Sequence, residues 1–369
     1  MKIRNYIYLF LLALVIFSCE DKNSYTIKGN IKGLQNPVIY VVSGNNLHID
    51  TIIAKSGKFT YKGVSKTTEP LLIYMEEKSA WITVWVQNGE KYTLTGDASY
   101  PEMIMVKGGE INNLLTEFKT ENLSLIKEKC ELGDKIISRV ENPEELNVHN
   151  DAQLSFQIKN IDQILKTRAQ DFVEANPSSI AALVIIQDFI LDIKNSSDIQ
   201  PFLELITEEV RINPIYEKLQ ILSSNDLQTK VGQPALNFKL MDTHNDTISL
   251  ETFKDKYLIL TFATSHCEFC KPDYSEILAI RKTFSEKDLA VLTVSLDENK
   301  EDWKKLAEEN EINWNQAVDS AGWASEMVSL YNVLSVPCNY LIDQKGIIIG
   351  SKLQVDSIKT ILTNNLKKK

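Results

Sequence analysis

Two cysteines three residues apart, Cys267 and Cys270, are the residues of this chain with the clearest capacity for chemistry. They follow an apolar run, Tyr257 to Phe262, that is typical of a short buried strand, and apolar residues at helical spacing come after them. Because the N-terminus of a helix stabilises an anion, Cys267 would ionise near neutral pH. Cys270 could then attack a mixed disulfide formed by Cys267. The spacing predicts a redox-active dithiol.

A C-x-x-C pair can also be one half of a zinc site. No second C-x-x-C and no H-x-x-x-H pattern follows it, and the chain holds four histidines in all. Since the pair lies between a strand and a helix, a redox role is favoured over a metal site. No G-x-G-x-x-G follows a strand, so we expect no nicotinamide or flavin cofactor. Electrons for a redox reaction would have to come from elsewhere.

The first residues resemble an export signal. Lys2 and Arg4 are followed by the apolar stretch Tyr6 to Phe17, which is too short to span a bilayer comfortably. The stretch ends in Ser18-Cys19, which resembles a lipoprotein cleavage box, although Phe17 is bulkier than the usual residue there. We predict a signal peptide over residues 1–18 and lipidation of Cys19. A plain secretory signal and an uncleaved anchor are the alternatives.

This reading places the mature protein in the cell envelope, anchored by lipid and facing the periplasm or the exterior, with the choice of inner or outer membrane left open. The formal net charge of −10 argues against a nucleic-acid partner. Export to an oxidising compartment permits disulfides. Of the other thiols, Cys130 lies in a charged helical stretch and is expected to be inert. Cys338 is expected to be structural, with a third redox thiol or a metal ligand as alternatives.

With 369 residues, the chain should contain two or three domains. Residues 19–107 alternate with period two between glycines, which predicts a small antiparallel sandwich or barrel. Within it, Trp81 and Trp85 are expected to pack against another domain, and a carbohydrate platform is the alternative. Both faces of their strand are expected to be covered.

The rest of the chain changes character twice. Residues 108–228 have few glycines and apolar residues at helical spacing, and they include an apolar helix predicted over Ile180 to Ile193. Residues 229–369 alternate strands and helices around the cysteine pair, which predicts an α/β domain with a central mixed sheet.

Several motifs of this last region occur in the order of the thioredoxin family. They are Val231-Gly-Gln-Pro, the C-x-x-C pair and Val336-Pro337 followed by Leu341-Ile342-Asp343. Residues 229–369 resemble the membrane-tethered thiol–disulfide oxidoreductases of the TlpA/ResA type. The region before them resembles a β domain of unknown function that precedes thioredoxin domains in envelope lipoproteins.

The resemblance implies specific roles. Cys267 matches the exposed nucleophile and Cys270 the resolving thiol, which form a disulfide with each other. Pro337 matches a cis-proline opposite the pair, and X-Pro bonds are the ones in which a cis peptide costs little. Val336 would present its backbone to an extended substrate. The implied partners are thiols and disulfides of exported proteins, including apocytochromes in cytochrome c maturation, and a membrane-embedded thiol electron donor.

Four positions depart from the family pattern or bear on its chemistry. His266 replaces a tryptophan, and it either stabilises the Cys267 thiolate when protonated or is an exposed bystander. Asp273 matches an acid of the reductase branch that could relay a proton to Cys270, or it is a carboxylate favoured by the helix dipole. Thr261 stands where a buried acid is common. Glu268 opposes a thiolate at Cys267, which favours a less oxidising pair.

Two other functions are alternatives to this one. A peroxidase would place Thr264 three residues before its nucleophile, but it usually also needs a proline at position 260, where this chain has leucine. A binding protein would use the thioredoxin fold without catalysis, either as a carrier of a metal or ligand through Cys267 and Cys270, with or without Cys338, or as a protein that recognises a ligand through its β domain.

Overall fold

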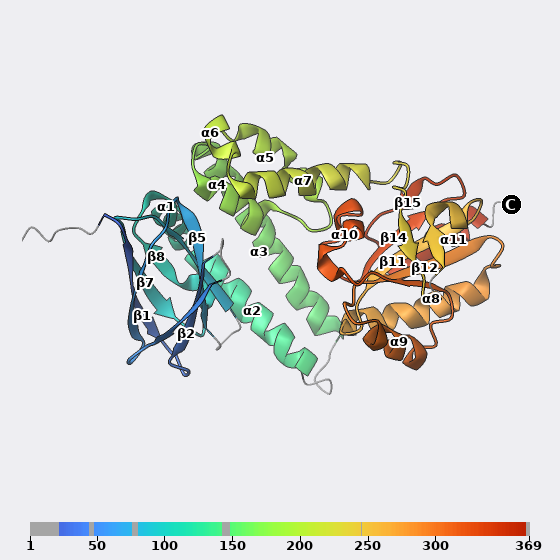
Figure 1. Cartoon of the computed structure of the whole chain (residues 1–369), viewed down its shortest axis with the longest axis horizontal. Coiled ribbons are helices and arrows are strands. Elements are labelled where there is room, and N and C mark those ends of the chain that lie inside the picture. The colour runs from blue at the N-terminus through green and yellow to red at the C-terminus, as the bar shows by residue number, and fades with distance from the viewer. Residues whose placement is uncertain (1–21, 44–47, 76–79, 142–147, 245, 367–369) are drawn as a thin grey trace, which may run out of the picture. The chain divides into compact units, whose positions relative to one another are not determined.

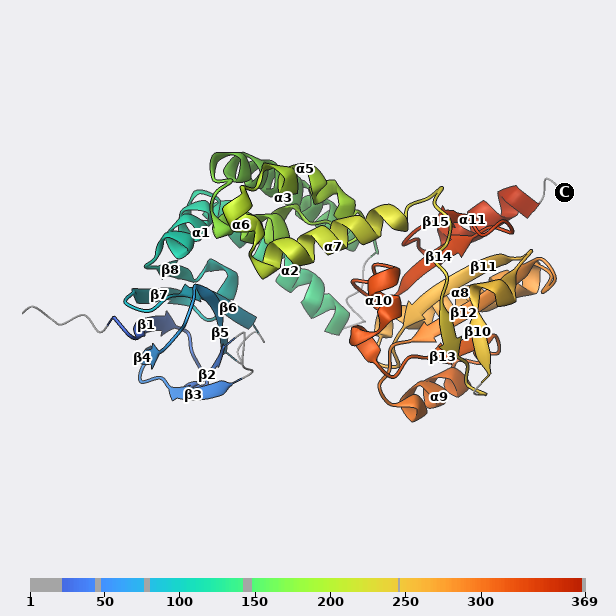
Figure 2. The same cartoon turned by 45° about the horizontal axis from the view of Figure 1, so that its top comes forward.

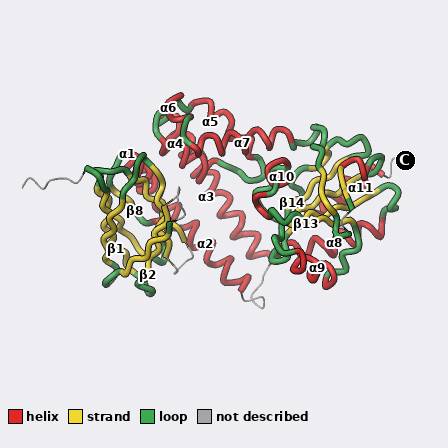
Figure 3. The backbone as a smooth tube through the Cα atoms, in the orientation of Figure 1, coloured by secondary structure: helices red, strands yellow, loops and turns green. Residues whose placement is uncertain are grey.

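The structure is a computed structural model, and it describes residues 22–43, 48–75, 80–141, 148–244 and 246–366. The chain divides into two compact units, Met1–Ile185 and Ile186–Lys369, which are described one after the other (Figures 1, 2 and 3). The predicted signal peptide and Cys19 lie outside the described residues. Every helix in the described part is too short or too polar to cross a lipid bilayer.

The first unit opens with a β-sandwich of two four-stranded sheets, ordered β4-β1-β7-β8 and β3-β2-β5-β6. Its strands are β1 (Tyr25–Lys32), β2 (Val38–Ser43), β3 (Ile49–Ile53), β4 (Lys58–Gly63), β5 (Glu69–Met75), β6 (Ala80–Val86), β7 (Lys91–Asp97) and β8 (Met105–Lys107). Alternate residues of both sheets, such as Ile27, Val41 and Leu94, share one core. The predicted β domain is confirmed. The purely antiparallel pairing is wrong, because β7 returns beside β1 in parallel after the chain has crossed to the second sheet.

The two tryptophans of β6 have different surroundings. Trp85 is 4% exposed, and Asn112 of helix α1 (Glu110–Glu121) exchanges hydrogen bonds of 2.9 and 2.8 Å with its backbone. Trp81 is 53% exposed and lies 4.7 Å from the ring of Tyr74, centroid to centroid. The expectation that both faces of this strand are covered is therefore correct at Trp85 and wrong at Trp81.

The predicted central helices are confirmed. In the first unit α1 is followed by α2 (Leu123–Glu141), α3 (Val148–Ala175) and α4 (Ile180–Ile185). After α4 the helix continues only through one π turn, Ile186–Ile190, and not to Ile193 as predicted. The Asp192 carboxylate accepts a hydrogen bond from the backbone N–H of Lys194 at 2.8 Å, and this local turn replaces the helical bonding.

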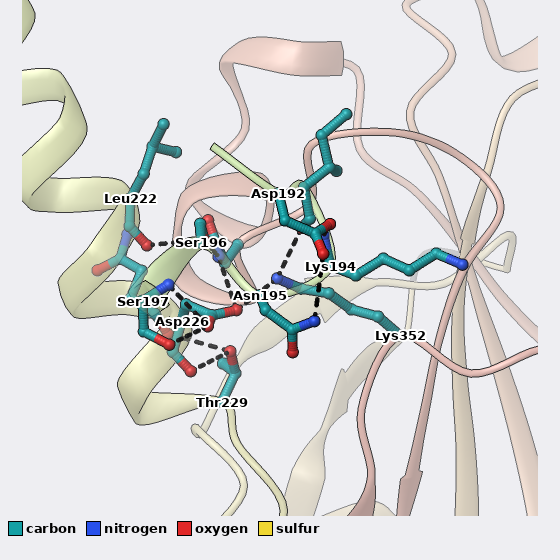
Figure 4. A network of polar contacts seen from close by, with 12 residues as sticks. Asp192, Lys194, Asn195, Ser196, Ser197, Leu222, Asp226, Thr229 and Lys352 are labelled. Carbon is teal, nitrogen blue, oxygen red and sulfur yellow. Dashed lines mark hydrogen bonds and ion pairs between the residues drawn. The ribbon is translucent and has the colours of Figure 1, made fainter. Parts of the chain in front are cut away.

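The second unit contains three further helices, α5 (Gln200–Leu205), α6 (Glu208–Arg211) and α7 (Pro214–Gln228). Near the end of α7, Asp226 forms a buried ion pair with Lys352, whose Nζ lies 2.6 Å from the carboxylate (Figure 4). Ser197 donates to the same carboxylate through its hydroxyl at 2.7 Å and its backbone N–H at 3.0 Å. The two charged side chains are 4% and 7% exposed. This network fixes α7 to the turn that follows strand β15.

The α/β part of the second unit is built on a five-stranded sheet ordered β13-β12-β11-β14-β15. Its strands are β11 (Tyr257–Ala263), β12 (Leu289–Ser295), β13 (Asn315–Val318), β14 (Cys338–Ile342) and β15 (Ile348–Gly350). The first three are parallel, and β14 and β15 are antiparallel to their neighbours. A hairpin of β9 (Lys239–Met241) and β10 (Thr247–Ser249) and the helices α8 (Lys271–Thr283), α9 (Lys300–Glu309), α10 (Glu326–Leu330) and α11 (Val355–Leu366) complete it. The predicted mixed sheet is confirmed.

Strand β11 is the centre of this sheet and is buried along its whole length. Leu258 and Leu260 face one core, which α10 and the hairpin also line, whereas Ile259 faces the core under α8, α9 and α11. Both faces are covered, so the strand is a continuous apolar run instead of an alternating one. Each such side chain contributes about 1.5–3 kcal/mol through burial. The strand is therefore a rigid support that ends where the cysteine segment begins.

Candidate active site

The two cysteines of the C-x-x-C segment are joined by a disulfide, with their Cα atoms 5.3 Å apart. Cys267 is partly exposed, whereas Cys270 is 0% exposed and packs in the core under α8. A 3-10 turn, Glu268–Cys270, separates Cys267 from α8, which begins at Lys271. An incoming sulfur atom can therefore reach Cys267 but not Cys270.

A buried carboxylate holds the loop in front of Cys267. The backbone N–H and the hydroxyl of Ser265 donate to Asp297 at 2.9 and 2.6 Å, and the Ser295 hydroxyl donates to it at 2.6 Å. Asp297 is 7% exposed and lies just beyond β12. Sequence reasoning missed this residue. The sequence pattern that could have indicated Asp297 is a run of polar residues directly after an apolar strand. The carboxyl ends of neighbouring parallel strands meet at one edge of a sheet, so such residues lie near the segment that follows the next strand.

The Val336–Pro337 peptide bond is cis. The strand that follows begins at Cys338, which pairs with Phe262 near the end of β11. Both Val336 and Cys267 border the same hydrophobic cluster. The structure thus brings the cysteine segment and the proline loop together at one end of the sheet.

Asp273 lies in the first turn of α8 and is partly buried. Its carboxylate accepts a hydrogen bond of 2.9 Å from the side-chain amide of Asn339. Burial raises the pKa of Asp273, and the hydrogen bond from Asn339 opposes this rise. Asn339 is the register partner of Thr261 on β11, the position at which a buried acid is common in the family. In this chain the residue beside that position, Asn339, contacts Asp273.

Two charged or titratable side chains flank Cys267 at the surface. His266 is exposed on the turn that precedes it. Glu268 is also exposed, and its carboxylate lies 2.7 Å from Nζ of Lys271. An exposed ion pair of this kind is weak, but it offsets part of the negative charge that Glu268 places beside the thiol. Glu268 therefore opposes the Cys267 thiolate less than its place in the sequence indicates.

The two remaining described cysteines are free thiols with raised pKa values. Burial raises the pKa of Cys338 to about 12. Burial, together with the nearby Glu102, raises the pKa of Cys130 to about 11. Across the described residues, no three histidine, cysteine or carboxylate side chains gather into a possible metal-ligand set.

Comparison with known families matches two regions of the chain. Residues 231–351 match the AhpC/TSA family. The chain carries a thioredoxin-like domain. Residues 25–115 match a domain of unknown function, DUF4369, so the expected β domain of unknown function is confirmed.

The thioredoxin-like domain is similar to named bacterial proteins. A thiol-disulfide oxidoreductase ResA from Bacillus cereus is 26% identical over 145 residues, which are 39% of this chain and 82% of the relative. A thioredoxin-like protein YneN from Bacillus subtilis is 26% identical over 132 residues, 35% of this chain and 75% of the relative. With the family match, the ResA relative confirms that the chain is an oxidoreductase.

Solved structures match the same region. The thioredoxin domain of a thiol-disulfide oxidoreductase from Bacteroides vulgatus is 27% identical and covers 37% of this chain and 96% of that chain, with a TM-score of 0.35. A thiol-disulfide oxidoreductase from Bacteroides fragilis is 29% identical and covers 37% of this chain and 98% of that chain, with a TM-score of 0.34.

Proposed function

We propose that the chain reduces disulfides in exported proteins through the Cys267–Cys270 dithiol. The observation that supports this most is the pairing of a partly exposed Cys267 with a fully buried Cys270. One sulfur can meet a substrate while the other is reserved for the internal step. The relative from Bacillus cereus is named as a thiol-disulfide oxidoreductase, which is the same reaction class.

The reaction proceeds in two exchanges. In the first, the Cys267 thiolate attacks one sulfur of the substrate disulfide in line, and the other substrate sulfur leaves and takes up a proton. In the second, Cys270 gives its proton to the Asp273 carboxylate, and its sulfur attacks Cys267 Sγ. The second substrate sulfur leaves as a thiolate and is protonated. Two electrons pass from the dithiol to the substrate, and the enzyme is left as the disulfide.

The proline loop and the exposed histidine form the substrate-binding part of the proposal. Val336, which precedes the cis-proline Pro337, packs against the same hydrophobic cluster as Cys267, and backbone groups of an extended segment can pair with a substrate strand. His266, next to Cys267, is positioned by sequence to contact the same substrate. Peptide segments that carry a disulfide are therefore the expected ligands.

The chain needs a source of electrons and a location. An oxidised dithiol must be reduced again, and we propose a membrane-embedded thiol protein as the donor. Lipidation at Cys19 would hold the chain in the cell envelope beside it. Exported proteins with reducible cysteines, apocytochromes among them, are the proposed substrates, which makes cytochrome c maturation one setting for this activity.

The test uses insulin reduction with dithiothreitol as the electron source. Cys267→Ala should reduce the rate to the uncatalysed background, and Cys270→Ser should trap a mixed disulfide with the substrate that a non-reducing gel detects. Cys338→Ala is the matched control and should retain the wild-type rate, because the thiol is buried with a raised pKa. Full activity of Cys267→Ala would refute the proposal. Stoichiometric zinc uptake without turnover, abolished by Cys338→Ser, would favour the carrier instead.

A further inference from the structure

Asn339 contacts Asp273 from the strand next to β11. It is the second residue of β14 and is 2% exposed. Its amide nitrogen donates to the Asp273 carboxylate at 2.9 Å and to the backbone carbonyl oxygen of Leu353 at 3.0 Å. A carbonyl oxygen can only accept, so the Leu353 contact requires the NH2 group on this side of the amide. The side chain is therefore oriented with a donor toward Asp273.

The other half of the same amide has no hydrogen bond. Asn339 Oδ1 is buried without a partner among the described residues. Leaving a buried acceptor unpaired costs about 1–3 kcal/mol, so the orientation of this amide calls for an explanation. Both donors of Asn339 are engaged while its acceptor is not. The hydrogen bond from the amide nitrogen to the Asp273 carboxylate thus accounts for the orientation of the Asn339 side chain.

Cys270 and Asp273 lie on one face at the start of α8. Cys270 is the N-cap of the helix and Asp273 is three residues further on, a spacing at which side chains are neighbours. Cys270 is fully buried, so its proton cannot pass directly to bulk water. Asp273 is the carboxylate next to it on this face.

We propose that Asn339 is a positioning residue that holds the Asp273 carboxylate ready to take the proton of Cys270. This inference rests on the proposed function and deepens it. As the Cys270 sulfur bonds to Cys267 and the substrate sulfur leaves, the Cys270 proton moves to the Asp273 carboxylate and then to solvent or to the leaving thiolate. A hydrogen bond from the amide favours the charged carboxylate over the neutral acid, so Asn339 keeps the acceptor available despite burial.

Other titratable groups lie near Asp273, and the test must separate their effect on its pKa from that of Asn339. On α8 itself these are Tyr274 and Glu276. On the packed helix α11, Asp356 and Lys359 act on Glu276, and beyond β12 Asp297 acts on Tyr274. Among the described residues, the Asn339 side chain donates to Asp273 and to Leu353, and to none of these groups. Removing that amide should therefore change the titration of Asp273 selectively.

The decisive experiment is a carbon-13 NMR titration of the Asp273 carboxyl in the oxidised full-length chain. Asn339→Leu should raise its midpoint by about one to two pH units, which corresponds to the loss of one hydrogen bond to a charged group. Asn310→Leu is the matched control, because that amide donates to the carbonyl of Leu306 within its own helix. An unchanged Asp273 midpoint in Asn339→Leu would overturn the inference.

A measurement on the wild type covers the case in which Asn339→Leu does not fold. The side-chain amide protons of Asn339 should shift with pH and follow the same midpoint as the Asp273 carboxyl carbon. Amide resonances that ignore the titration of Asp273 would refute the contact.

The pH dependence of insulin reduction separates positioning from simple packing. In Asn339→Leu, the acidic limb of the rate profile should move to higher pH by the same amount as the carboxyl midpoint. In an Asp273→Asn background, Asn339→Leu should cause no further shift, and a shift there would count against the inference. A wild-type chain without reductase activity would refute the proposed function, and the carboxyl titration would then show only whether Asn339 stabilises the Asp273 carboxylate.

Discussion

Burial controls the ionisation of the acid beside Cys270. The folded chain raises the pKa of Asp273 through burial, and Asn339 offsets this only in part. An unfolded aspartate ionises near pH 4. The native state therefore holds this proton to a higher pH than the unfolded state, and its stability falls as the pH rises from about 4 through the folded pKa.

Asp273→Asn removes the free-energy cost of burying the ionised carboxylate of Asp273. The variant should be more stable than wild type at pH 7 and nearly equal at pH 3, where the carboxyl is protonated in both states. Urea unfolding of the two oxidised proteins at both pH values measures the difference. A loss of stability at pH 7, or an equal gain at both pH values, would contradict the assignment.

The thiols outside the pair should be unreactive in the folded chain. With pKa values of about 11 at Cys130 and about 12 at Cys338, almost no thiolate is present at pH 7. After reduction, iodoacetamide should modify Cys267 first and these two residues only after denaturation, as read by peptide mass spectrometry. Rapid native labelling of Cys338 would support the alternative of a third redox thiol.

At the scale of single elements, the central strand β11 and the helix after it could be predicted from sequence. The side-chain contacts that neighbouring strands make with this helix could not be predicted. A continuous apolar run followed by C-x-x-C predicts β11 and the segment after it. The hydrogen bond between Asn339 and Asp273 joins residues 66 positions apart. It depends on which strand pairs with β11 and in which register, and a single sequence carries no direct signal for either.

Short elements were missed for a related reason. Strand β13 has four residues, and β9 and β10 have three each, so no period can be recognised in them. Asp297 was missed because its role follows from the parallel pairing of β11 and β12. The cysteine pair was predicted from residue types and spacing, whereas Val336 and Pro337 were named from the resemblance to the thioredoxin family.

The ion pair between α7 and the turn after β15 makes a prediction about stability. Lys352→Met leaves the buried Asp226 carboxylate without its charged partner, which should lower the free energy of unfolding by about 3–5 kcal/mol. Chemical denaturation at pH 7 measures this. The exposed Glu268–Lys271 pair provides the control, and Lys271→Met should cost at most about 1 kcal/mol. Equal effects of the two substitutions would show that the buried pair adds nothing.

The same pair should make stability sensitive to acid. Burial raises the pKa of Asp226, but the hydrogen bonds from Lys352 and Ser197 outweigh it and hold the pKa below its ordinary value. The stabilisation is therefore complete above about pH 4 and lost as the pH falls through the folded pKa. In Lys352→Met, this part of the acid-induced loss should be absent. An unaltered acid profile of the variant would contradict the assignment.

At the scale of the whole molecule, the two family matches cover the β domain and the thioredoxin-like domain, and the helices between them match neither. The alternation of residue patterns along the chain predicted this order of fold classes. The proposed lipid anchor at Cys19, which would hold both domains at the membrane, can be tested by an experiment in cells.

Cys19→Ala should release the chain from the membrane. If this residue carries the lipid, the variant loses incorporation of a labelled fatty acid and is recovered in the soluble fraction after cell lysis. The Cys130→Ala variant is the control and should remain membrane-bound. Retention of Cys19→Ala in the membrane fraction would show that another segment provides the anchor.

The midpoint potential of the Cys267–Cys270 pair tests the central claim most directly. It can be measured on the full-length chain by equilibration in glutathione or dithiothreitol buffers and alkylation of the free thiols. A reductase supplied by a membrane donor should give a value below about −230 mV, toward that of thioredoxin. A value above about −150 mV would contradict this account and indicate an oxidase or isomerase.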